Sequence, residues 1–156
     1  MDGMWFKQVE QGRRFVIKIA PGQRLHARLV EFARTAGVTQ AVVVSAIGSV
    51  EDVRFRGIKS GAKLPITAPR IHEHEVQGPL ELLGLTGNLV PDEQGEVDCH
   101  LHVIAARSSG EVLGGHLHDA KVFATCEIVL TEILGAGIER HLSKSGGIAT
   151  VFIQEG

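Results

Sequence analysis

The segment from Val97 to His116 constrains the fold of this chain more than any other part of the sequence. Two strand-like runs, Val97 to Ala106 and Val112 to His116, flank the turn residues Arg107-Ser108-Ser109-Gly110. This pattern predicts an antiparallel β-hairpin. A three-residue loop of residues 108–110 suits a glycine, because its last position takes the left-handed conformation.

The register of this hairpin decides which side chains meet. With a three-residue loop, counting along both strands places His102 opposite His116. His100 lies on the same face as His102, because side chains alternate along a strand. A two-residue loop would place Leu101 opposite His116, and the three imidazoles would not share a face.

Three histidines on one face predict a metal site, since histidine is the commonest protein ligand for metals such as zinc. Three neutral imidazoles leave a fourth coordination position open, as in catalytic zinc sites, although a metal that only stiffens the fold is the alternative. Gly114 and Gly115 remove side-chain bulk beside the predicted metal. We expect His118 to lie past the strand end, where Asp119 begins a turn.

Length and composition indicate one globular domain over residues 1–156, with 44% hydrophobic and 22% charged residues. No apolar run reaches the roughly 18 residues of a membrane span, so no membrane association is expected. Trp5-Phe6-Lys7-Gln8 interrupts the start of the chain, and we expect no signal peptide. Cys99 and Cys126 fall in apolar strand patterns, which favours buried thiols and a cytoplasmic location.

Charge is unevenly spread along the chain, whose formal net charge is −2. Residues 1–70 hold 12 Lys and Arg against 5 Asp and Glu, whereas residues 71–156 hold 4 against 13. Such opposed halves favour complementary surfaces between subunits. The overall balance argues against nucleic-acid binding by bulk charge, and Arg24, Arg28 and Arg34 on the expected helix offer only nonspecific phosphate contacts.

Hydrophobic periodicity predicts one helix among many strands. The helix covers residues 25–36, with Gly37 as its stop signal, and residues 57–70 form a loop. Strands are expected over residues 13–19, 41–47, 50–55, 80–85, 97–106, 112–116, 122–131 and 148–153. Gly48-Ser49 breaks the second run, and residues 135–147 form a polar connection. The sequence therefore predicts an α+β domain with a mostly antiparallel sheet, one main helix and short helical connections.

Several motifs together resemble the plants and prokaryotes conserved (PPC) domain family, in its stand-alone prokaryotic type. The matching segments are Gly78-Pro79-Leu80-Glu81-Leu82-Leu83-Gly84-Leu85-Thr86-Gly87-Asn88, His100-Leu101-His102, Gly114-Gly115-His116-Leu117 and Ala124-Thr125-Cys126-Glu127-Ile128-Val129-Leu130. The resemblance covers nearly the whole chain.

This resemblance implies a compact α+β fold, a homotrimer and a divalent metal ion, with zinc expected, on His100, His102 and His116. In plant relatives the domain accompanies AT-hooks that grip DNA, but this chain has no Arg-Gly-Arg-Pro hook. We therefore expect no specific DNA binding from the isolated domain. The segment from Gly78 to Leu83 resembles the one through which plant relatives engage partner proteins.

Two carboxylates interrupt apolar strand patterns and leave alternatives open. Glu81 either orients a ligand histidine from behind the metal or forms an ion pair with Arg54 or Arg56. Glu127 either serves as a general base at the metal or lies on a solvated sheet face.

The alternating segment His72-Glu73-His74-Glu75 forms either a second metal site or, as we expect, an exposed entry into a strand. Two function classes follow from these observations. One is a trimeric metalloprotein that binds or hydrolyses a small anionic or carbonyl-containing molecule. The other is a noncatalytic regulatory or assembly domain whose target is DNA or a partner protein.

Overall fold

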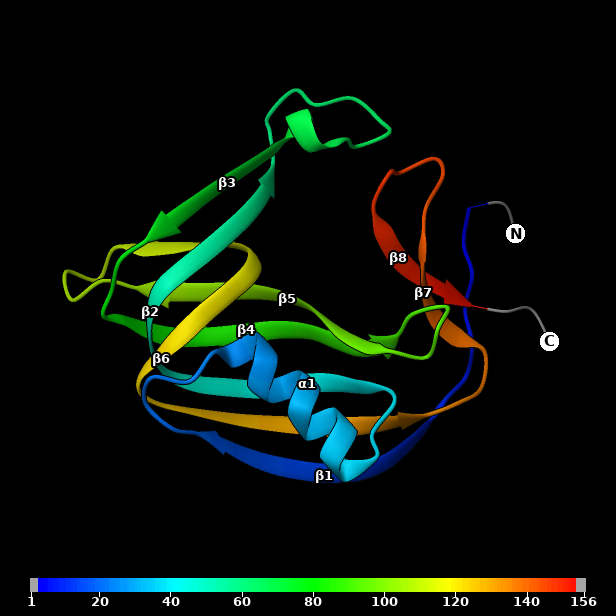
Figure 1. The fold of residues 1–156 in the computed structure, drawn as a ribbon, viewed down its shortest axis with the longest axis horizontal. Coiled ribbons are helices and arrows are strands. Elements are labelled where there is room, and N and C mark those ends of the chain that lie inside the picture. Colours follow the sequence, from blue (N-terminus) through cyan, green and yellow to red (C-terminus); the bar gives the residue numbers. More distant parts are fainter. Residues whose placement is uncertain (1–2, 154–156) are drawn as a thin grey trace.

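The structure is a computed structural model that describes residues 3–153 (Figure 1). Strands and one α-helix alternate along the chain with short connections. In chain order the elements are β1 (Glu10–Ile19), α1 (Leu25–Ala36), β2 (Ala41–Ile58), the 3₁₀ turn η1 (Ala68–Arg70), β3 (Ile71–Val76), β4 (Leu80–Pro91), β5 (Val97–Ala106), β6 (Val112–Leu134), β7 (Ile138–Leu142) and β8 (Ala149–Ile153). The predicted class is confirmed: a mostly antiparallel sheet with one helix.

The main sheet has six strands in the order β1-β6-β5-β4-β2-β3, and every neighbouring pair is antiparallel. A further pairing of β2 with β6 closes β2, β4, β5 and β6 into a ring. Closure leaves no free edge among these four strands, so their backbone groups are paired on both sides. β1 and β3 extend the ring as outer strands.

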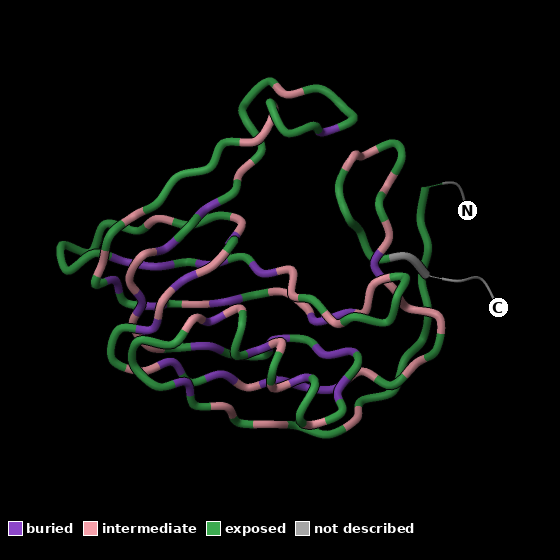
Figure 2. Tube along the Cα trace, viewed as in Figure 1, coloured by how far each residue is buried: buried purple, intermediate pink, exposed green. Residues whose placement is uncertain are grey.

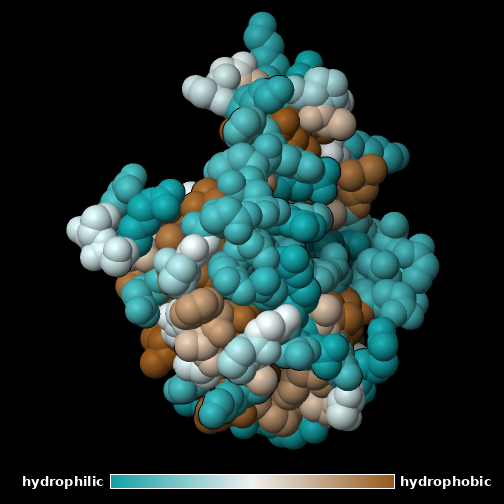
Figure 3. All heavy atoms as spheres, turned by 60° about the vertical axis from the view of Figure 1, so that its left-hand side comes forward, coloured by the Kyte–Doolittle hydropathy of each residue, from teal (hydrophilic) through white to brown (hydrophobic). Residues whose placement is uncertain are grey.

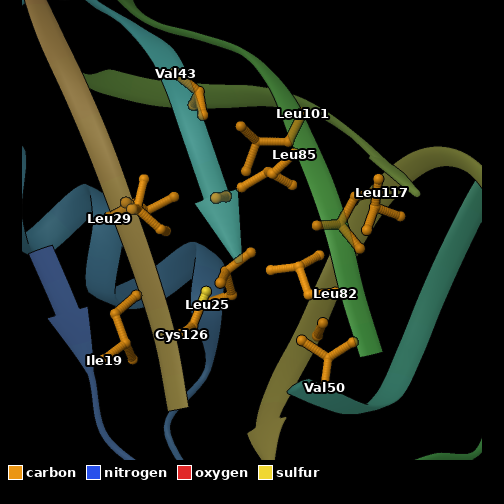
Figure 4. Close-up of a cluster of buried hydrophobic side chains, with 14 of the residues drawn as sticks. Ile19, Leu25, Leu29, Val43, Val50, Leu82, Leu85, Leu101, Leu117 and Cys126 are labelled. Atoms are coloured by element: carbon orange, nitrogen blue, oxygen red, sulfur yellow. The ribbon is translucent and has the colours of Figure 1, made fainter. Parts of the chain in front are cut away.

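The core fills the inside of this ring and the space under α1 (Figure 2). Side chains from five strands and the helix point toward one another there, among them Leu29, Leu85, Leu101 and Cys126 (Figure 4). Leu29 is fully buried, and burial of a leucine side chain contributes roughly 1.5–3 kcal/mol. The hydrophobic face that α1 carries at helical spacing therefore holds the helix against the sheet.

α1 ends where its sequence predicts. Gly37 adopts the left-handed conformation with φ of +64°, and its backbone N–H points at the last carbonyl groups of the helix. Phe32 on the outer part of the helix packs edge-to-face on Phe15 of β1, with ring centroids 5.0 Å apart. Within residues 3–153 no helix is long and apolar enough to cross a membrane.

Four strands, β1, β2, β4 and β6, are longer than predicted, and β2 and β6 each join two predicted strands because the backbone accommodates irregularities without leaving the sheet. Gly48 does not end β2: its φ is +149°, and a Cβ there would overlap the carbonyl oxygen of Thr125. The glycine therefore permits a bulge at which pairing with β6 continues. The turn predicted at Asp119 was also wrong, since Asp119 pairs with Arg54 inside a continuous β6.

The predicted connection at residues 135–147 contains a strand that sequence reasoning missed. β7 pairs with β8 in a separate two-stranded sheet. β7 also touches the main sheet, through a parallel bridge between Asp92 and Arg140. The closing strand predicted at residues 148–153 is present but pairs with β7 instead of joining the main sheet. This ribbon stands beyond the end of β4 and β5 (Figure 1).

Candidate metal centre

The hairpin between β5 and β6 has the predicted loop. The backbone N–H of Arg107 donates to the carbonyl of Glu111 at 2.9 Å, and Gly110 donates to Arg107 at 2.9 Å. Gly110 has φ of +86°, the left-handed conformation that this loop requires. The resulting register places His102 directly opposite His116, which confirms the predicted pairing.

Three imidazoles converge on this hairpin. One ring nitrogen from each of His100, His102 and His116 lies within 4.8 Å of the other two. The Nε2 atoms of His100 and His102 are 3.3 Å apart. Ring centroids lie 5.0 to 5.4 Å apart, and the rings are tilted by 52° to 81°. The rings thus meet through their nitrogen edges instead of stacking face to face.

Burial and neighbouring positive groups favour the neutral, metal-binding form of two of these imidazoles, His100 and His116. The pKa of His116 is lowered to about 4, first by burial and then by the nearby rings of His100 and His102. The pKa of His100 is lowered by burial and by the guanidinium of Arg140. A neutral imidazole offers a free lone pair at pH 7, so no proton must leave before a metal binds there.

Neighbouring strands fix the backbone of the three histidines. On β4, Thr86 lies opposite His102 and Asn88 lies opposite His100. Gly87 between them has φ of +141°, and a Cβ at this position would overlap the carbonyl oxygen of His100. The glycine therefore lets β4 approach β5 at the level of the ligand set.

The two glycines before His116 differ in what surrounds them. A Cβ on Gly114 would lie 2.6 Å from the carbonyl oxygen of Val103, and a Cβ on Gly115 would lie 3.5 Å from the ring of Phe55. The small size of Gly114 therefore makes room for the neighbouring strand, whereas a Cβ on Gly115 would make only an ordinary contact with Phe55.

Neither predicted carboxylate lies in register with the three histidines. Glu81 pairs with Ala106, whereas the partner of His102 on β4 is Thr86. At about 3.3 Å per residue, Glu81 and Thr86 lie about 16 Å apart along the strand. Arg54 and Arg56, its alternative partners, bind Glu75 and Glu73 instead. The second predicted carboxylate, the exposed Glu127, pairs with Lys18 and Ile47 and lies 11 residues beyond His116 on β6. The structure therefore assigns the site no carboxylate from these two positions.

The other histidines flank the site without completing it. His118 is exposed and lies within β6, not past its end as predicted. His72 and His74 lie on β3, where their rings stack at 5.1 Å, and His74 stacks on Phe55 at 5.1 Å. Both are exposed, as expected for a strand at the edge of the sheet. They line a hollow of about 540 Å³ that also reaches His116 and the paired glycines.

Sequence reasoning missed Arg140, which approaches the site from β7. Its Nη2 donates a hydrogen bond of 2.7 Å to Oδ1 of Asn88, the residue opposite His100. No local signal could have revealed this contact, because the two residues are 52 positions apart. Residues 138–142 read Ile-Glu-Arg-His-Leu, and the three consecutive polar residues give no alternating pattern that would have predicted the strand carrying Arg140.

Comparison with solved structures shows the same fold in two archaeal proteins. A plant- and prokaryote-conserved protein from Pyrococcus horikoshii is 27% identical, with a TM-score of 0.82 over 97% of this chain and 99% of that protein. A metal-containing protein from Archaeoglobus fulgidus is 29% identical, with a TM-score of 0.82 over 96% of this chain and 99% of that protein.

Curated relatives contain this domain within longer chains. The bifunctional protein GlmU of Synechococcus sp. (strain JA-3-3Ab) is 29% identical over 144 residues, which are 92% of this chain and 21% of that protein. The AT-hook motif nuclear-localized protein 14 of Arabidopsis thaliana is 29% identical over 101 residues, which are 64% of this chain and 22% of that protein. This chain thus spans about a fifth of the length of the curated relatives it matches.

The family model of the Plants and Prokaryotes Conserved (PCC) domain matches residues 6–134. These residues include β1 to β6, α1 and all three histidines of the hairpin. The match confirms the resemblance that the sequence motifs indicate, and this chain therefore belongs to the Plants and Prokaryotes Conserved domain family.

Proposed function

We propose that this chain binds one divalent metal ion through His100, His102 and His116, and that this metal is zinc. The spacing of the nitrogen atoms is the observation that carries this proposal. Zinc–nitrogen bonds of about 2.0–2.1 Å in a tetrahedral site place neighbouring ligand nitrogens about 3.3 Å apart. The Nε2 atoms of His100 and His102 have this separation.

A similar protein adds support. The Archaeoglobus fulgidus structure, 29% identical over nearly the whole chain, is described as a metal-containing protein. A structural zinc site normally has four protein ligands, whereas this cluster supplies three histidines. A metal held in this way keeps a free coordination position and acts as a Lewis acid toward small anionic or carbonyl-containing molecules. We therefore propose a metal-dependent binding or hydrolytic centre for such molecules.

The chain's own residues would fix the ligand set in three ways. The β5–β6 register aligns His102 with His116. Close approach at Gly87 fixes the backbone of His100. Burial keeps the ring of His116 neutral, as its lowered pKa indicates. The metal is thereby bound by groups that need no rearrangement of the strands.

Elemental analysis of the purified full chain tests this proposal. We expect about one zinc per chain in the wild type and at least a tenfold to hundredfold loss of affinity in His102→Ala or His116→Ala. His118→Ala is the matched control, because His118 is exposed on the same strand and is not among the converging nitrogens. Zinc retained at wild-type stoichiometry in the triple histidine variant would disprove the site. A broad hydrolase screen of the zinc-loaded protein then tests for activity.

We also propose that the chain assembles as a homotrimer. Ile47, Leu83 and Ile104 are 57%, 53% and 51% exposed and come from three neighbouring strands, β2, β4 and β5. Register places Ile47 next to Leu83 and Ile104 opposite Gly84, so the three side chains form an apolar row. On the face drawn in Figure 3, hydrophobic residues form scattered patches among hydrophilic ones. An apolar row across a sheet is typical of a surface that another subunit covers.

A reducing compartment such as the cytoplasm is our proposal for the cellular location. Cys99 and Cys126 are both free thiols, and Cys126 is fully buried. Burial raises the pKa of each thiol to about 12, so neither forms the reactive thiolate at neutral pH. The fold therefore contains two reduced cysteines and does not use them for a cross-link.

A further inference from the structure

Arg140 is a buried cation that no carboxylate contacts directly. Its residue is 9% exposed, and its Nε atom is buried with no hydrogen-bond partner. Its Nη2 donates to the neutral amide oxygen of Asn88. Among the residues that the structure describes, no carboxylate oxygen lies within 4.0 Å of its guanidinium nitrogens. Burial of a charge without a direct ion pair is unfavourable, and only the more distant carboxylate of Asp98 acts on this guanidinium, so the arrangement favours a further anion in contact with it.

The acidic residues near Arg140 are engaged elsewhere. Asp98 binds the ring of His26, with Oδ1 2.7 Å from Nε2. Asp92, which forms the backbone bridge to Arg140, accepts the N–H groups of Gln94 and Glu96 through its Oδ1 atom. Neither carboxylate therefore neutralises the guanidinium directly.

Arg140 lies beside the candidate metal centre. Asn88 is directly opposite His100 in the register of β4 and β5, so their side chains share one face of the sheet. The guanidinium that binds Asn88, with Nη2 2.7 Å from Oδ1, therefore lies on the side of β4 and β5 that carries His100. Arg140 also lies outside residues 6–134, the part that matches the family model. The β7–β8 ribbon thus adds the guanidinium of Arg140 to a site whose three histidines lie in the part of the chain that matches the family model.

We propose that the metal centre binds a small molecule through an oxyanion group, a carboxylate or a phosphate, which pairs with Arg140 while the molecule occupies the open metal position. This inference rests on the metal site proposed above and names its ligand class. The planar guanidinium matches the paired oxygens of carboxylate and phosphate groups, and its buried Nε–H still lacks an acceptor. The ligand would supply a negative charge in direct contact with the guanidinium.

Calorimetric titration of the zinc-loaded full chain tests this inference, with succinate and inorganic phosphate as separate probes. We expect Arg140→Gln to weaken binding of the preferred probe about 10- to 100-fold, the loss typical of a hydrogen-bonded ionic contact. Arg140→Lys should restore part of the affinity, because it keeps the charge without the planar fork. The matched control is Arg107→Gln, which removes an exposed arginine at the hairpin tip, paired with Glu111. Zinc content should stay unchanged in all three variants.

Different outcomes separate this inference from the proposed metal site. Wild-type protein without zinc would overturn the metal site and the inference with it. Zinc-loaded wild type that binds neither probe, or Arg140→Gln that binds as tightly as wild type, would overturn the inference alone. A structural role of Arg140 predicts equal destabilisation with and without the probe, whereas anion binding predicts that the probe raises the unfolding midpoint of the wild type only. If Arg140→Gln does not fold, Arg140→Lys still must bind more weakly than wild type.

Discussion

Gly87 of β4 lies directly against the backbone of His100 on β5. Its φ of +141° is unfavourable for residues with a side chain, and a Cβ at this position would overlap the carbonyl oxygen of His100. β4 and β5 can therefore approach each other this closely at the ligand set only because residue 87 has a hydrogen atom where other residues have a Cβ.

Gly87→Ala should destabilise the protein and weaken metal binding together. Strain at this φ and displacement of the His100 backbone should lower the free energy of unfolding by about 2–3 kcal/mol. Urea unfolding of the zinc-free and zinc-loaded proteins measures both effects. Gly84→Ala on the same strand is the control, because a Cβ there meets no atom within 4 Å. Equal stability of Gly87→Ala and wild type would contradict this account.

Deletion of Ser109 should abolish the metal site while the sheet persists. A three-residue loop that still ends at the left-handed Gly110 then consists of Arg107, Ser108 and Gly110. Ala106 faces Glu111 in this hairpin, so the register shifts by one and Leu101, instead of His102, lies opposite His116. We expect zinc binding to fall at least as far as in His102→Ala, with the β-rich circular dichroism spectrum retained. Ser109→Ala, which keeps the loop length, should bind zinc normally. Normal zinc binding by the deletion variant would show that the register does not position the ligands.

Sequence patterns correctly predicted the elements whose conformation is determined by residues close together in the sequence. The helix bounds of residues 25–36 follow from apolar spacing and from Gly37, and the hairpin register follows from the loop that ends at Gly110. β5 runs from Val97 to Ala106, as the apolar pattern predicts. In each case, neighbours in sequence determine the conformation, so the sequence alone contains the needed signal.

Errors arose where a strand is held by distant partners. β2 continues through Gly48 because β6 pairs with it on both sides of the bulge. An irregularity between Leu82 and Gly84 shifts the alternation of β4, so Leu83 is exposed while Leu85, two residues further on, is buried. The approach of Arg140 to Asn88 likewise depends on tertiary packing and not on any local pattern. Metal binding itself stays a prediction until it is measured.

Acid should destabilise this fold in part through Glu132. Hydrogen bonds from the side chain and backbone N–H of Arg13 lower the pKa of Glu132 to about 2. Because the folded-state pKa lies below the ordinary value of 4.5, the stabilisation is present above pH 4.5 and is lost as the pH falls from 4.5 toward 2. Glu132→Gln should therefore be less stable than wild type at pH 7, and the difference should shrink at pH 3.

Urea unfolding at the two pH values measures this difference. Glu96→Gln is the control, because Glu96 is exposed in the turn between β4 and β5. A stability difference between wild type and Glu132→Gln that is the same at pH 7 and pH 3 would exclude the ionised Glu132–Arg13 pair as the cause.

Substitution of Ile47 by lysine should dissociate the proposed homotrimer. A charge at Ile47, the β2 end of the apolar row that it forms with Leu83 and Ile104, would have to be buried when the subunits associate. Light scattering should give close to three times the chain mass of 16.8 kDa for the wild type and close to one chain mass for the variant. Leu64→Lys, at a residue 68% exposed in the loop before β3, should leave the mass unchanged. A stable wild-type monomer at micromolar concentration would refute the trimer.

DNA binding by this chain should be weak and independent of sequence. Formal net charge is −2, no Arg-Gly-Arg-Pro hook is present, and the helix buries its apolar face against the sheet. Arg28 on that helix pairs with Glu31, and Arg24 lies 3.8 Å from Asp119, so two of its three arginines already face carboxylates.

Specific binding has dissociation constants of roughly 10⁻⁸ M or below at physiological salt, whereas phosphate contacts alone give roughly 10⁻⁴ to 10⁻⁶ M. Titration of labelled duplexes of varied sequence at physiological salt should therefore show only the weaker range, with affinity that falls steeply as salt rises. Tight binding to one sequence that survives competition by bulk DNA would instead favour a regulatory role for the domain.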